Sequence, residues 1–559
     1  MRDALVIKES LKHTLSSLGI EADVASMVLE FPADMSNGDY ATNVALVYAK
    51  QSGKSPRDLA AAIVGAMGTI APVARIEIAG PGFINFTLSP QALAASLDEA
   101  RTQDEWGNND LQKGKKIIVE YTDPNPFKEF HIGHLMSNAI GESIARLLQF
   151  SGAEVKRACY QGDVGLHVAK AMWGKSKSPE AVWGKAYADG AQAYEQGGQS
   201  KDEINALNKK IYERSDLQIN ALYDAGRQLS LNHFEELYKI LGTQFDHYFF
   251  ESDTGAFGKQ IVEERPDVFE KSDGAIVYKG DEAKGLHTRV FINSEGLPTY
   301  EAKELGLAKI KYERYPYDTS VVITGNEVND YFRVLLDAMT KVFPDLAAKT
   351  VHISHGMMRF AEGKMSSRTG NVITGESLLN DLSEAAKARA AESRADDHDK
   401  LAQDIAVAAI KYQILKQSSG KDIIFDRERA LSLEGDSGPY LQYAYARTNA
   451  VIAKAHAQGV PPLPLGEGWG EGVFGPAASL VRILHRFPEI VEYAARELEP
   501  HISAQYLLHL ASAFNSWYGQ EQILDGTPAA AHKVALTEAV NRTLKNGLWI
   551  LGIPAPEKM

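Results

Sequence analysis

The sequence predicts an α/β protein whose central domain is built on a largely parallel, doubly wound sheet. A small α+β domain precedes it and an all-α helical bundle follows it. Strand and helix signals alternate between residues 106 and 375, the segment before them mixes both kinds, and the segment after them is helical nearly throughout. A chain of 559 residues also exceeds what one hydrophobic core usually organises, so several domains are expected.

The first predicted domain covers residues 1–105. Helical periodicity at its start gives way to a strand of alternating character, interrupted at residues 80–82 by Gly, Pro and Gly. The hydrophobic positions of this strand are Ile76, Ile78, Phe83, Ile84 and Phe86. A polar stretch from Gln103 to Lys115 then separates this domain from the next.

The second predicted domain, residues 106–375, opens with a βαβ unit. A strand from Lys116 to Tyr121 precedes a helix that ends at Gly152, and a second strand covers Glu154 to Tyr160. Further strands of the parallel sheet are expected at Ile276–Tyr278, Thr288–Ile292, Val321–Thr324 and His352–Ser354. Residues 168–265 lack strand signals and predict a helical insertion. Residues 376–559 predict a helical bundle, interrupted by an exposed Pro- and Gly-rich loop at 461–476.

Composition restricts the class of protein. The chain is 44% hydrophobic and 24% charged, and it offers no run of about eighteen apolar residues, so we expect a soluble protein. The absence of a signal sequence and the single cysteine, Cys159, suit a cytoplasmic location. A net charge of −14 argues against indiscriminate nucleic-acid binding but leaves room for a local basic surface.

A short turn with two histidines is the first candidate site. His131, Ile132, Gly133 and His134 lie between a strand and the N-terminus of a helix, where ligands of doubly wound sheets collect and anions are favoured. Two imidazoles there can donate hydrogen bonds to phosphate oxygens, and Gly133 permits close approach of a nucleotide. Alone, the pattern also fits two surface histidines. A metal site is less favoured because no third ligand lies at suitable spacing.

The second candidate is the polar, glycine-flanked loop of residues 363–370. Such a loop can close over a triphosphate and stabilise the departing pyrophosphate. Its side chains include Lys364, Met365, Ser366 and Arg368. By itself it also fits a solvated turn, but two such motifs in one α/β domain favour a nucleotide site.

Together the two motifs resemble the HIGH and KMSKS signatures of class I aminoacyl-tRNA synthetases, with the first intact. Other segments resemble the arginyl branch of that family across all three domains. These are Val119–Asn125 leading to Lys128 and His131, Gly38–Asn43, Gly80–Asn85, Gly435–Tyr443 and Leu551–Met559.

The resemblance implies a Rossmann-like catalytic domain with a helical insertion, an N-terminal domain that touches the tRNA elbow and an anticodon-binding helical domain. It also implies that the arginine carboxylate attacks the α-phosphate of Mg²⁺-bound ATP, and that tRNA then takes the arginyl group from the adenylate. AMP and pyrophosphate are released. The expected partners are ATP, arginine and the tRNA for arginine; the expected state is a monomer without a tightly bound cofactor or metal.

Carried over residue by residue, the resemblance implies four sets of site residues. The catalytic set is His131, His134, Lys128 and Lys364. The ATP-binding set is Gly133, His131, His134, Lys364, Met365, Ser366 and Arg368. The arginine-binding set is Glu120, Asn125, Tyr300 and Glu304, since carboxylates hold a planar guanidinium by paired hydrogen bonds. The tRNA-binding set is Tyr440, Gln442, Tyr443, Trp517 and Met559.

Three positions depart from the family pattern. Glu304 stands where aspartate is usual, Val328 beside Glu327 stands where glutamine is common, and Ser367 replaces the second lysine of the signature loop. Lys128 is our candidate for supplying that missing charge.

Each assignment has a structural alternative. Glu120 also fits an ordinary strand-end carboxylate, Lys128 a solvated lysine, and Tyr300 and the aromatic residues of the bundle fit core packing. For the whole protein, the alternatives are a catalytically silent tRNA-binding paralogue and another HIGH-type nucleotidyl transferase that acts on a small molecule. The intact histidines and lysines speak against the first, and the long helical bundle speaks against the second.

Overall fold

The computed structural model describes residues 3–360, 373–466 and 475–559. The chain divides into two compact units. The larger comprises Asn108–Ala446, Glu489–Leu508 and Lys545–Met559, and the smaller comprises Met1–Gly107, Arg447–Pro488 and His509–Leu544. The chain first passes from the smaller unit to the larger one between Gly107 and Asn108, close to the predicted boundary at residue 105. Helices of the predicted bundle, in contrast, contribute to both units.

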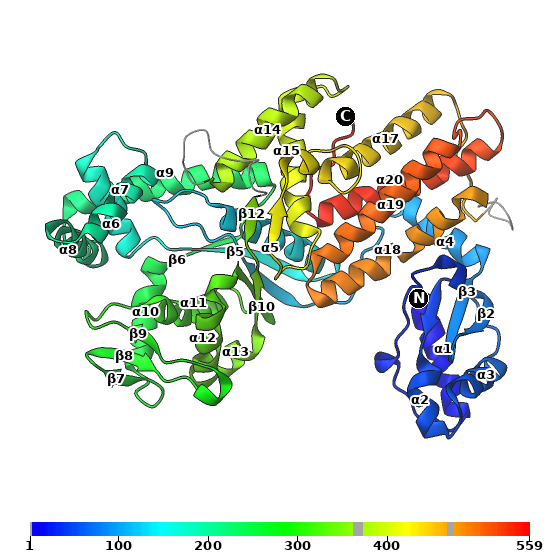
Figure 1. Ribbon diagram of the computed structural model, residues 1–559, viewed down its shortest axis with the longest axis horizontal. Coiled ribbons are helices and arrows are strands. Elements are labelled where there is room, and N and C mark those ends of the chain that lie inside the picture. The colour runs from blue at the N-terminus through cyan, green and yellow to red at the C-terminus, as the bar shows by residue number, and fades with distance from the viewer. Residues whose placement is uncertain (1–2, 361–372, 467–474) are drawn as a thin grey trace. The chain divides into compact units, whose positions relative to one another are not determined.

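The larger unit contains a sheet of five parallel strands in the order β11-β10-β4-β5-β6 (Figure 1). The strands are β4 (Lys116–Glu120), β5 (Glu154–Gln161), β6 (His247–Phe250), β10 (Thr319–Gly325) and β11 (Thr350–His355). The chain proceeds from β4 to one edge and returns on the other side of β4. The strand order therefore reverses between β4 and β10, and ligands of doubly wound sheets bind at the carboxyl ends of strands beside such a point.

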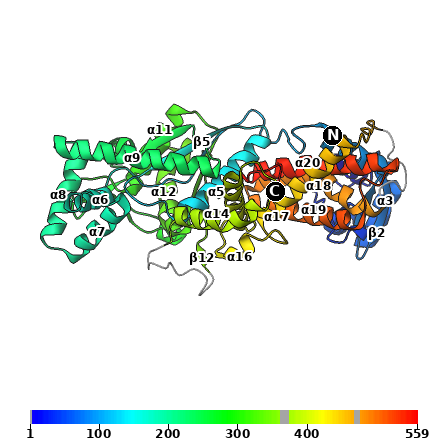
Figure 2. The same ribbon diagram turned by 90° about the horizontal axis from the view of Figure 1, so that it is seen from above.

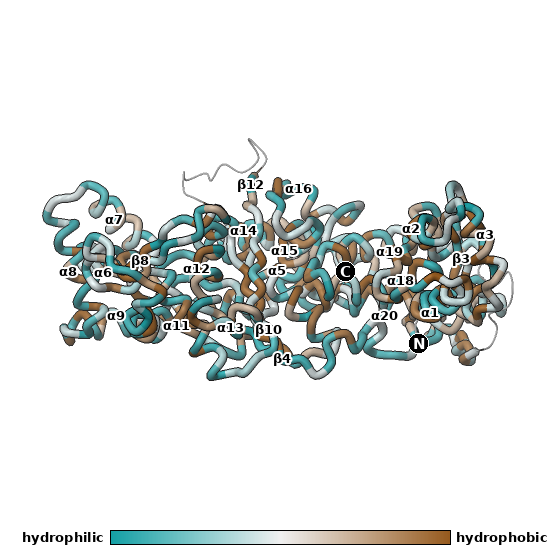
Figure 3. The backbone as a smooth tube through the Cα atoms, turned by 90° about the horizontal axis from the view of Figure 1, so that it is seen from below, coloured by the Kyte–Doolittle hydropathy of each residue, from teal (hydrophilic) through white to brown (hydrophobic). Residues whose placement is uncertain are grey.

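Helices cover both faces of this sheet. Helix α5 (Ile132–Phe150) packs on β4, β5 and β10, and α11 (Tyr300–Arg314) covers the other face, where Leu307 meets Ile118 and Ala158. Each of the strands β4 and β10 carries a run of hydrophobic residues, 117–119 and 321–323, as expected for strands covered on both faces (Figure 3). Beyond α5 lie α14 (Gly375–Ala391) and α15 (His398–Leu415), which pack against it.

The predicted insertion is helical over most of its length. It contains α6 (Leu166–Lys177), α7 (Trp183–Gln196), α8 (Gln199–Glu213) and α9 (Leu217–Leu241), and both views show α6 to α8 gathered near one end of α9 (Figures 1 and 2). The prediction that residues 168–265 hold no strand is wrong, because β6 lies within that range and forms the sheet edge beside β5. A strand of four residues followed at once by α10 (Glu251–Glu263) gives too little periodicity to be recognised.

Two other predicted strands are real but belong to a different sheet. Residues 276–278 and 288–292 contribute to β8 (Ala275–Tyr278) and β9 (Arg289–Ile292), which form an antiparallel sheet with β7 (Glu270–Ser272). Strands β7 and β8 are joined at Asp273 and Gly274, whose φ angles of 47° and 80° suit a tight hairpin. This sheet packs with α12 (Asn329–Val342) and α13 (Pro344–Lys349) in one hydrophobic core.

The smaller unit begins with the predicted α+β fold. Its antiparallel sheet has the order β1-β3-β2, and the predicted strand around residues 76–86 is a hairpin that turns at Gly80 and Gly82, both with positive φ. The elements are α1 (Asp3–Ser17), β1 (Tyr40–Thr42), α2 (Val44–Ser52), α3 (Pro56–Ala66), β2 (Val73–Ala79), β3 (Phe83–Leu88) and α4 (Pro90–Thr102).

The described residues of the C-terminal third are largely helical, as predicted, and include the short strand β13 (Ile423–Phe425). Strand β13 pairs in parallel with β12 (Met358–Phe360). The helices are α16 (Arg427–Ala430), α17 (Gly438–Ala457), α18 (Ala478–Glu497), α19 (Pro500–Gln520) and α20 (Ala529–Ile550). Among the helices of the described ranges, none has the length and apolar character needed to cross a lipid bilayer.

Candidate active site

The turn that follows β4 has an unusual backbone. Thr122, Asp123 and Phe127 have positive φ angles of 80°, 46° and 69°. Non-glycine residues in such conformations cost on the order of 1–3 kcal/mol each and persist only where their surroundings hold them. Here the N–H of Thr122 donates to Ser137 Oγ at 2.9 Å, and Asp123 Oδ1 accepts from the N–H of Tyr160 at 2.6 Å. A side chain of α5 and a backbone N–H of β5 therefore hold the turn.

The two histidines cap the N-terminus of α5 through a reciprocal pair of hydrogen bonds. The N–H of His131 donates to Nδ1 of His134 at 3.2 Å, and the N–H of His134 donates to Nδ1 of His131 at 3.4 Å. Their rings stack with centroids 3.4 Å apart. A Cβ at Gly133 would lie 3.0 Å from the His131 ring, so glycine leaves room for this stack. Because each Nδ1 accepts a hydrogen bond, each neutral ring carries its proton on Nε2.

The surroundings keep both imidazoles neutral at neutral pH. Burial, the neighbouring His131 and Lys128 hold the pKa of His134 well below its usual value. Burial and Lys128 also lower the pKa of His131, against the opposing charge of Glu327. The motif thus presents two Nε2–H donors at a helix N-terminus, an arrangement suited to an anion such as a phosphate group.

Lys128 is not a freely solvated lysine. Its side chain is half-buried, and its Nζ lies 4.8 Å from the ring centroid of Tyr187 in α7. Burial lowers the pKa of Lys128, while Glu251 raises it. The solvated-lysine alternative is therefore not what the structure describes.

The loop candidates Lys364, Met365, Ser366 and Arg368, together with Ser367, lie outside the described residues. The segment that follows them is placed next to the histidines. His131 forms an antiparallel β-bridge with Thr374, and the N–H of Gly375 donates to the carbonyl of Phe130 at 2.8 Å. Thr374 and Gly375, which follow that loop in the sequence, therefore lie beside the histidine motif.

A buried acidic cluster lies on the α11 side of the same turn. Nζ of Lys311 is 2.7 Å from Oε2 of Glu120, and their side chains are 5% and 2% exposed. Burial and the charge of Glu120 raise the pKa of both Asp123 and Glu304 well above their usual values. Glu120 is thus more than a surface carboxylate, although Lys311 already occupies one of its oxygens.

A second buried ion pair adjoins this cluster. Nζ of Lys303 lies 2.5 Å from Oε2 of Glu251, with both side chains 6% exposed. The ring of Tyr300 has its centroid 5.3 Å from the same Nζ and is 58% exposed, so Tyr300 does not pack in the core. A Cβ at Gly162 would lie 2.3 Å from Oδ1 of Asn125 and 3.2 Å from Glu251, so this glycine lets the two side chains approach each other.

Of the four predicted arginine-binding residues, Glu120 and Asn125 lie at or just after the carboxyl end of β4, and Tyr300 and Glu304 lie in the first turns of α11. Sequence reasoning missed the cations Lys303 and Lys311 and the carboxylate Glu251. One signal was present: Lys311 follows Glu304 by seven residues, which places both on one face of a helix.

The tRNA candidates differ in accessibility. Gln442 is fully buried, and its amide nitrogen donates to the carbonyls of Pro554 at 2.9 Å and Asp404 at 3.1 Å. Trp517 is 5% exposed and packs beside Phe514. The core-packing alternative therefore describes Trp517, and the burial of Gln442 leaves its side chain without access to a tRNA ligand. The remaining candidates, which are half-buried, are Tyr440, Tyr443 and Met559.

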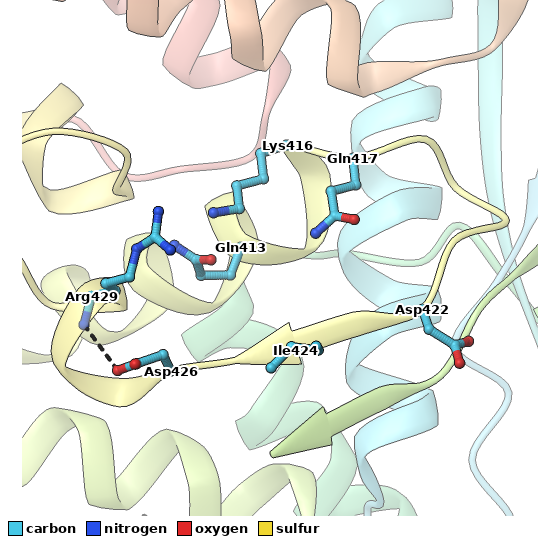
Figure 4. A pocket seen from close by; sticks show the side chains of 7 residues that line it. All are labelled: Gln413, Lys416, Gln417, Asp422, Ile424, Asp426 and Arg429. Atoms are coloured by element: carbon cyan, nitrogen blue, oxygen red, sulfur yellow. Dashed lines mark hydrogen bonds between the residues drawn. The ribbon is translucent and has the colours of Figure 1, made fainter. Parts of the chain in front are cut away.

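A surface pocket of about 240 Å³ lies elsewhere in the larger unit, over β13 (Figure 4). It is lined by Gln413, Lys416, Gln417, Asp422, Ile424, Asp426 and Arg429. Its two cations are paired with Asp436, Lys416 at 2.7 Å and Arg429 at 3.8 Å. None of the predicted site residues lines it, so we do not assign the reaction to this pocket.

Family models agree with the fold and the site. Residues 96–427 match the model described as the catalytic domain of class I tRNA synthetases (R). Residues 5–88 match the arginyl-tRNA synthetase N-terminal domain, and residues 441–559 match the DALR anticodon-binding domain. A doubly wound sheet with a histidine motif at its switch point thus places the chain among the class I tRNA synthetases.

Proteins similar to this chain over its full length identify the branch of the class I tRNA synthetases to which it belongs. The arginine–tRNA ligase of Limosilactobacillus reuteri is 31% identical, with 100% of both chains covered, and that of Clostridioides difficile is 29% identical, with 99% of both covered. The solved arginyl-tRNA synthetase of Thermus thermophilus superposes with a TM-score of 0.75 at 25% identity, covering 99% of both chains. The chain belongs to the arginyl-tRNA synthetase family.

Proposed function

We propose that this chain attaches arginine to its tRNA in two steps, through an arginyl adenylate formed from ATP. The observation that carries the proposal is the placement of two complementary sites on one turn. The histidine motif, suited to an anion, follows β4, and the acidic cluster, suited to a cation, includes Glu120, the last residue of β4, where the strand order reverses.

In the activation step, the histidine motif receives the triphosphate. His131 and His134 donate from Nε2 to phosphate oxygens as negative charge develops, and Gly133 lets the nucleotide approach the helix N-terminus. Lys128, with Lys364 and Arg368 of the signature loop, neutralises the departing pyrophosphate, and Met365 and Ser366 complete the nucleotide contacts. ATP enters as its Mg²⁺ complex, which is a substrate here.

In the arginine subsite, Glu120 and Glu304 accept hydrogen bonds from the guanidinium. A planar group with five donors satisfies two carboxylates at once, whereas the compact ammonium of lysine cannot. Asn125 contacts the amino-acid end, and the exposed ring of Tyr300 covers the side chain of the substrate. The ammonium group of Lys311 pairs with the carboxylate of Glu120 and fixes its position.

The helical C-terminal domain, residues 376–559, binds the anticodon arm, and the N-terminal domain, residues 1–105, contacts the tRNA elbow. Tyr440, Tyr443 and Met559 are the candidate contacts with side chains that are partly accessible. We further propose that the chain acts as a monomer in the cytoplasm.

Arginine-dependent exchange of pyrophosphate into ATP, measured with and without tRNA, tests the proposal. We expect exchange with arginine, and transfer of labelled arginine to tRNA. A chain that binds tRNA but shows no exchange would be a silent paralogue. Exchange supported by another small molecule, and not by arginine, would assign it to a different nucleotidyl transferase.

A further inference from the structure

The segment Gly38–Asn43 carries part of the family resemblance but has no role in the proposed reaction. Its second residue is held against β3: the N–H of Asp39 donates to the carbonyl of Phe86 at 2.7 Å, and Oδ2 of Asp39 accepts from the N–H of Leu88 at 2.8 Å. A Cβ at Gly38 would lie 2.6 Å from the same carbonyl oxygen, so glycine permits this approach. The other carboxylate oxygen, Oδ1 of Asp39, is left for a partner outside the sheet.

That partner belongs to a helix of the C-terminal third. Nε of Arg482 in α18 donates to Oδ1 of Asp39, and the two side chains are 18% and 5% exposed. His485, three residues further along α18, lies between two hydroxyl groups. Its Nε2 is 3.1 Å from the hydroxyl oxygen of Tyr40 in β1, and its Nδ1 is 2.8 Å from Oγ of Ser96 in α4. Residues three apart share one face of a helix, so this face of α18 meets the N-terminal domain.

Helix α4 makes further contacts with the segment that follows α17. Arg101 donates from Nη2 to the carbonyl of Leu463 at 2.7 Å, and Oδ2 of Asp98 accepts from the N–H of Gly466 at 2.7 Å. Arg101 and Asp98 are themselves paired at 2.9 Å. The N-terminal domain is therefore attached to the C-terminal third at two places, α18 and the segment before it.

The contact with α18 is shielded from water. Asp39, Tyr40 and His485 are all buried. Burial lowers the pKa of His485 to about 4, so at neutral pH its ring is neutral and bridges the two hydroxyl groups with one donor and one acceptor nitrogen. A buried ion pair such as that of Asp39 and Arg482 is difficult to separate, because each charge would lose its partner. We therefore expect the N-terminal domain and α18 to move together.

We propose that Asp39 and Tyr40 dock the N-terminal domain on Arg482 and His485 of α18, so that one body holds the tRNA elbow and the anticodon arm at a fixed spacing. The four side chains are positioning residues, which set the distance between two RNA contacts without touching RNA. The inference rests on the proposed function, since it takes the N-terminal domain to contact the elbow and the helical domain to bind the anticodon arm.

A fixed spacing affects the affinity for whole tRNA. When two contacts are linked stiffly and match the ligand, the second contact forms at a high effective concentration, and a looser linkage lowers that concentration. Loosening the interface with α18 should therefore weaken binding of whole tRNA and leave binding of an isolated anticodon arm unchanged. The rate of arginine activation at saturating tRNA should also be unchanged, because the four positioning residues belong neither to the histidine motif nor to the acidic cluster.

The variant Arg482→Met tests this expectation, because it keeps the length of the side chain and removes the guanidinium that reaches Asp39. Binding of the whole tRNA for arginine, and of a hairpin RNA with the sequence of its anticodon arm, is measured on the full chain. We expect the Kd of tRNA to rise by roughly a hundredfold, the low end of the gain that linking two contacts supplies, and the Kd of the hairpin to stay at the wild-type value.

Arg496→Met is the matched control, because it removes an arginine of the same helix whose side chain is 55% exposed and is paired with the adjacent Glu497. The ratio of the two dissociation constants should not change in this control. If the ratio is also unchanged in folded Arg482→Met, whether both ligands bind as in the wild type or both bind more weakly, the inference is overturned and the proposed function stands.

The wild-type chain provides a test that does not depend on the folding of a variant. A tRNA whose anticodon stem is lengthened by one base pair keeps the elbow and the anticodon loop but changes the distance between them. A fixed spacing predicts weaker binding of the lengthened tRNA to the wild-type chain and a smaller difference between the two tRNAs in Arg482→Met. Equal affinity of the wild-type chain for both tRNAs would overturn the inference. A wild-type chain that binds neither tRNA would instead count against the proposed function.

Discussion

The two halves of the active site show opposite ways of preparing for a charged substrate. The histidine motif meets an anion with neutral donors whose tautomer is set by the backbone N–H groups of His131 and His134. The acidic cluster meets a cation with buried carboxyls, one of which is already paired with Lys311. The first lies just after β4, and the second includes the last residue of β4.

The two sites differ in which groups carry the charge that attracts the substrate. At the histidine motif the positive potential comes from a helix N-terminus and from Lys128, so the imidazoles need not titrate. In the acidic cluster the charge resides on the contacting groups themselves, in a place where burial makes it costly. We therefore expect substitutions in the cluster to have the larger effects and the stronger dependence on pH.

The largest effect is expected for Glu120→Gln, which keeps the shape and removes the charge. The specificity constant for arginine should fall on the order of ten-thousandfold, because a site built to pair with a charged group is left unpaired. Steady-state kinetics with varied arginine concentration measure this specificity constant. A value near that of the wild type would contradict the role of Glu120.

This variant also leaves Lys311 buried without its partner, which costs about 3–5 kcal/mol of folding free energy. The double variant Glu120→Gln with Lys311→Met separates stability from binding. Thermal unfolding should show recovery of most of the lost stability, while arginine activation stays impaired. Recovery of activation together with stability would mean that Glu120 acts only on the fold.

Substituting either histidine should lower adenylate formation by about a hundredfold to a thousandfold, the effect of losing one donor to a developing charge. Arginine affinity should not change. Since both pKa values are lowered from the usual value for histidine, both rings are neutral above about pH 7, and the wild-type rate at saturating arginine should be flat from about pH 7 to about pH 8. His13→Ala, at an exposed position of α1, is the control. A rate that follows a single titration in this range would show that an imidazole changes charge.

Lys128→Ala should slow adenylate formation by roughly a hundredfold, because Lys128 supplies charge that Ser367 does not. If the side chains at positions 128 and 367 both neutralise the departing pyrophosphate, adding Ser367→Lys to the Lys128→Ala variant should restore part of the rate. Lys201→Ala removes a comparable lysine of the insertion, one whose Nζ lies 5.5 Å from the Tyr194 ring, and should be silent. Single-turnover measurements with tRNA present would refute the shared role if Lys128→Ala stayed within about twofold of wild type.

The smallest effects are expected at two glycines, one in each half. Gly133→Ala would displace the His131 ring and should lower the activation rate, whereas Gly162→Ala would displace Asn125 and should raise KM for arginine. Forcing a side chain from its rotamer costs about 0.5–1.5 kcal/mol, so each change should be at most about tenfold. Steady-state kinetics of both variants are the check. Identical effects on the two parameters would show that the halves are not independent.

Much of this arrangement could be predicted from the sequence. The β4–α5–β5 unit has strong local patterns, and the histidine motif lies at the helix start that those patterns predict. Strand β6 was missed because four residues carry little periodicity, and β8 and β9 were assigned to the wrong sheet because strand signals do not reveal the partner strand.

The acidic cluster was harder to predict. Its central ion pair joins residues 191 positions apart in the chain, and nothing local marks either one as buried. The resemblance to a family supplied Glu120 and Glu304 but gave no indication of Lys311. Likewise, the burial of Gln442 depends on its contact with Pro554, which only the folded chain brings near.

The left-handed backbone of Thr122, Asp123 and Phe127 bears on how this protein could be engineered. Glycine at these positions would relieve the conformational cost, and a search for thermostable variants would favour such changes. The same relaxation would let the strand end that carries Glu120 drift away from the helix that carries the histidines. Heat tolerance and catalytic competence are therefore expected to trade off at this turn, and variants selected for one should be screened for the other.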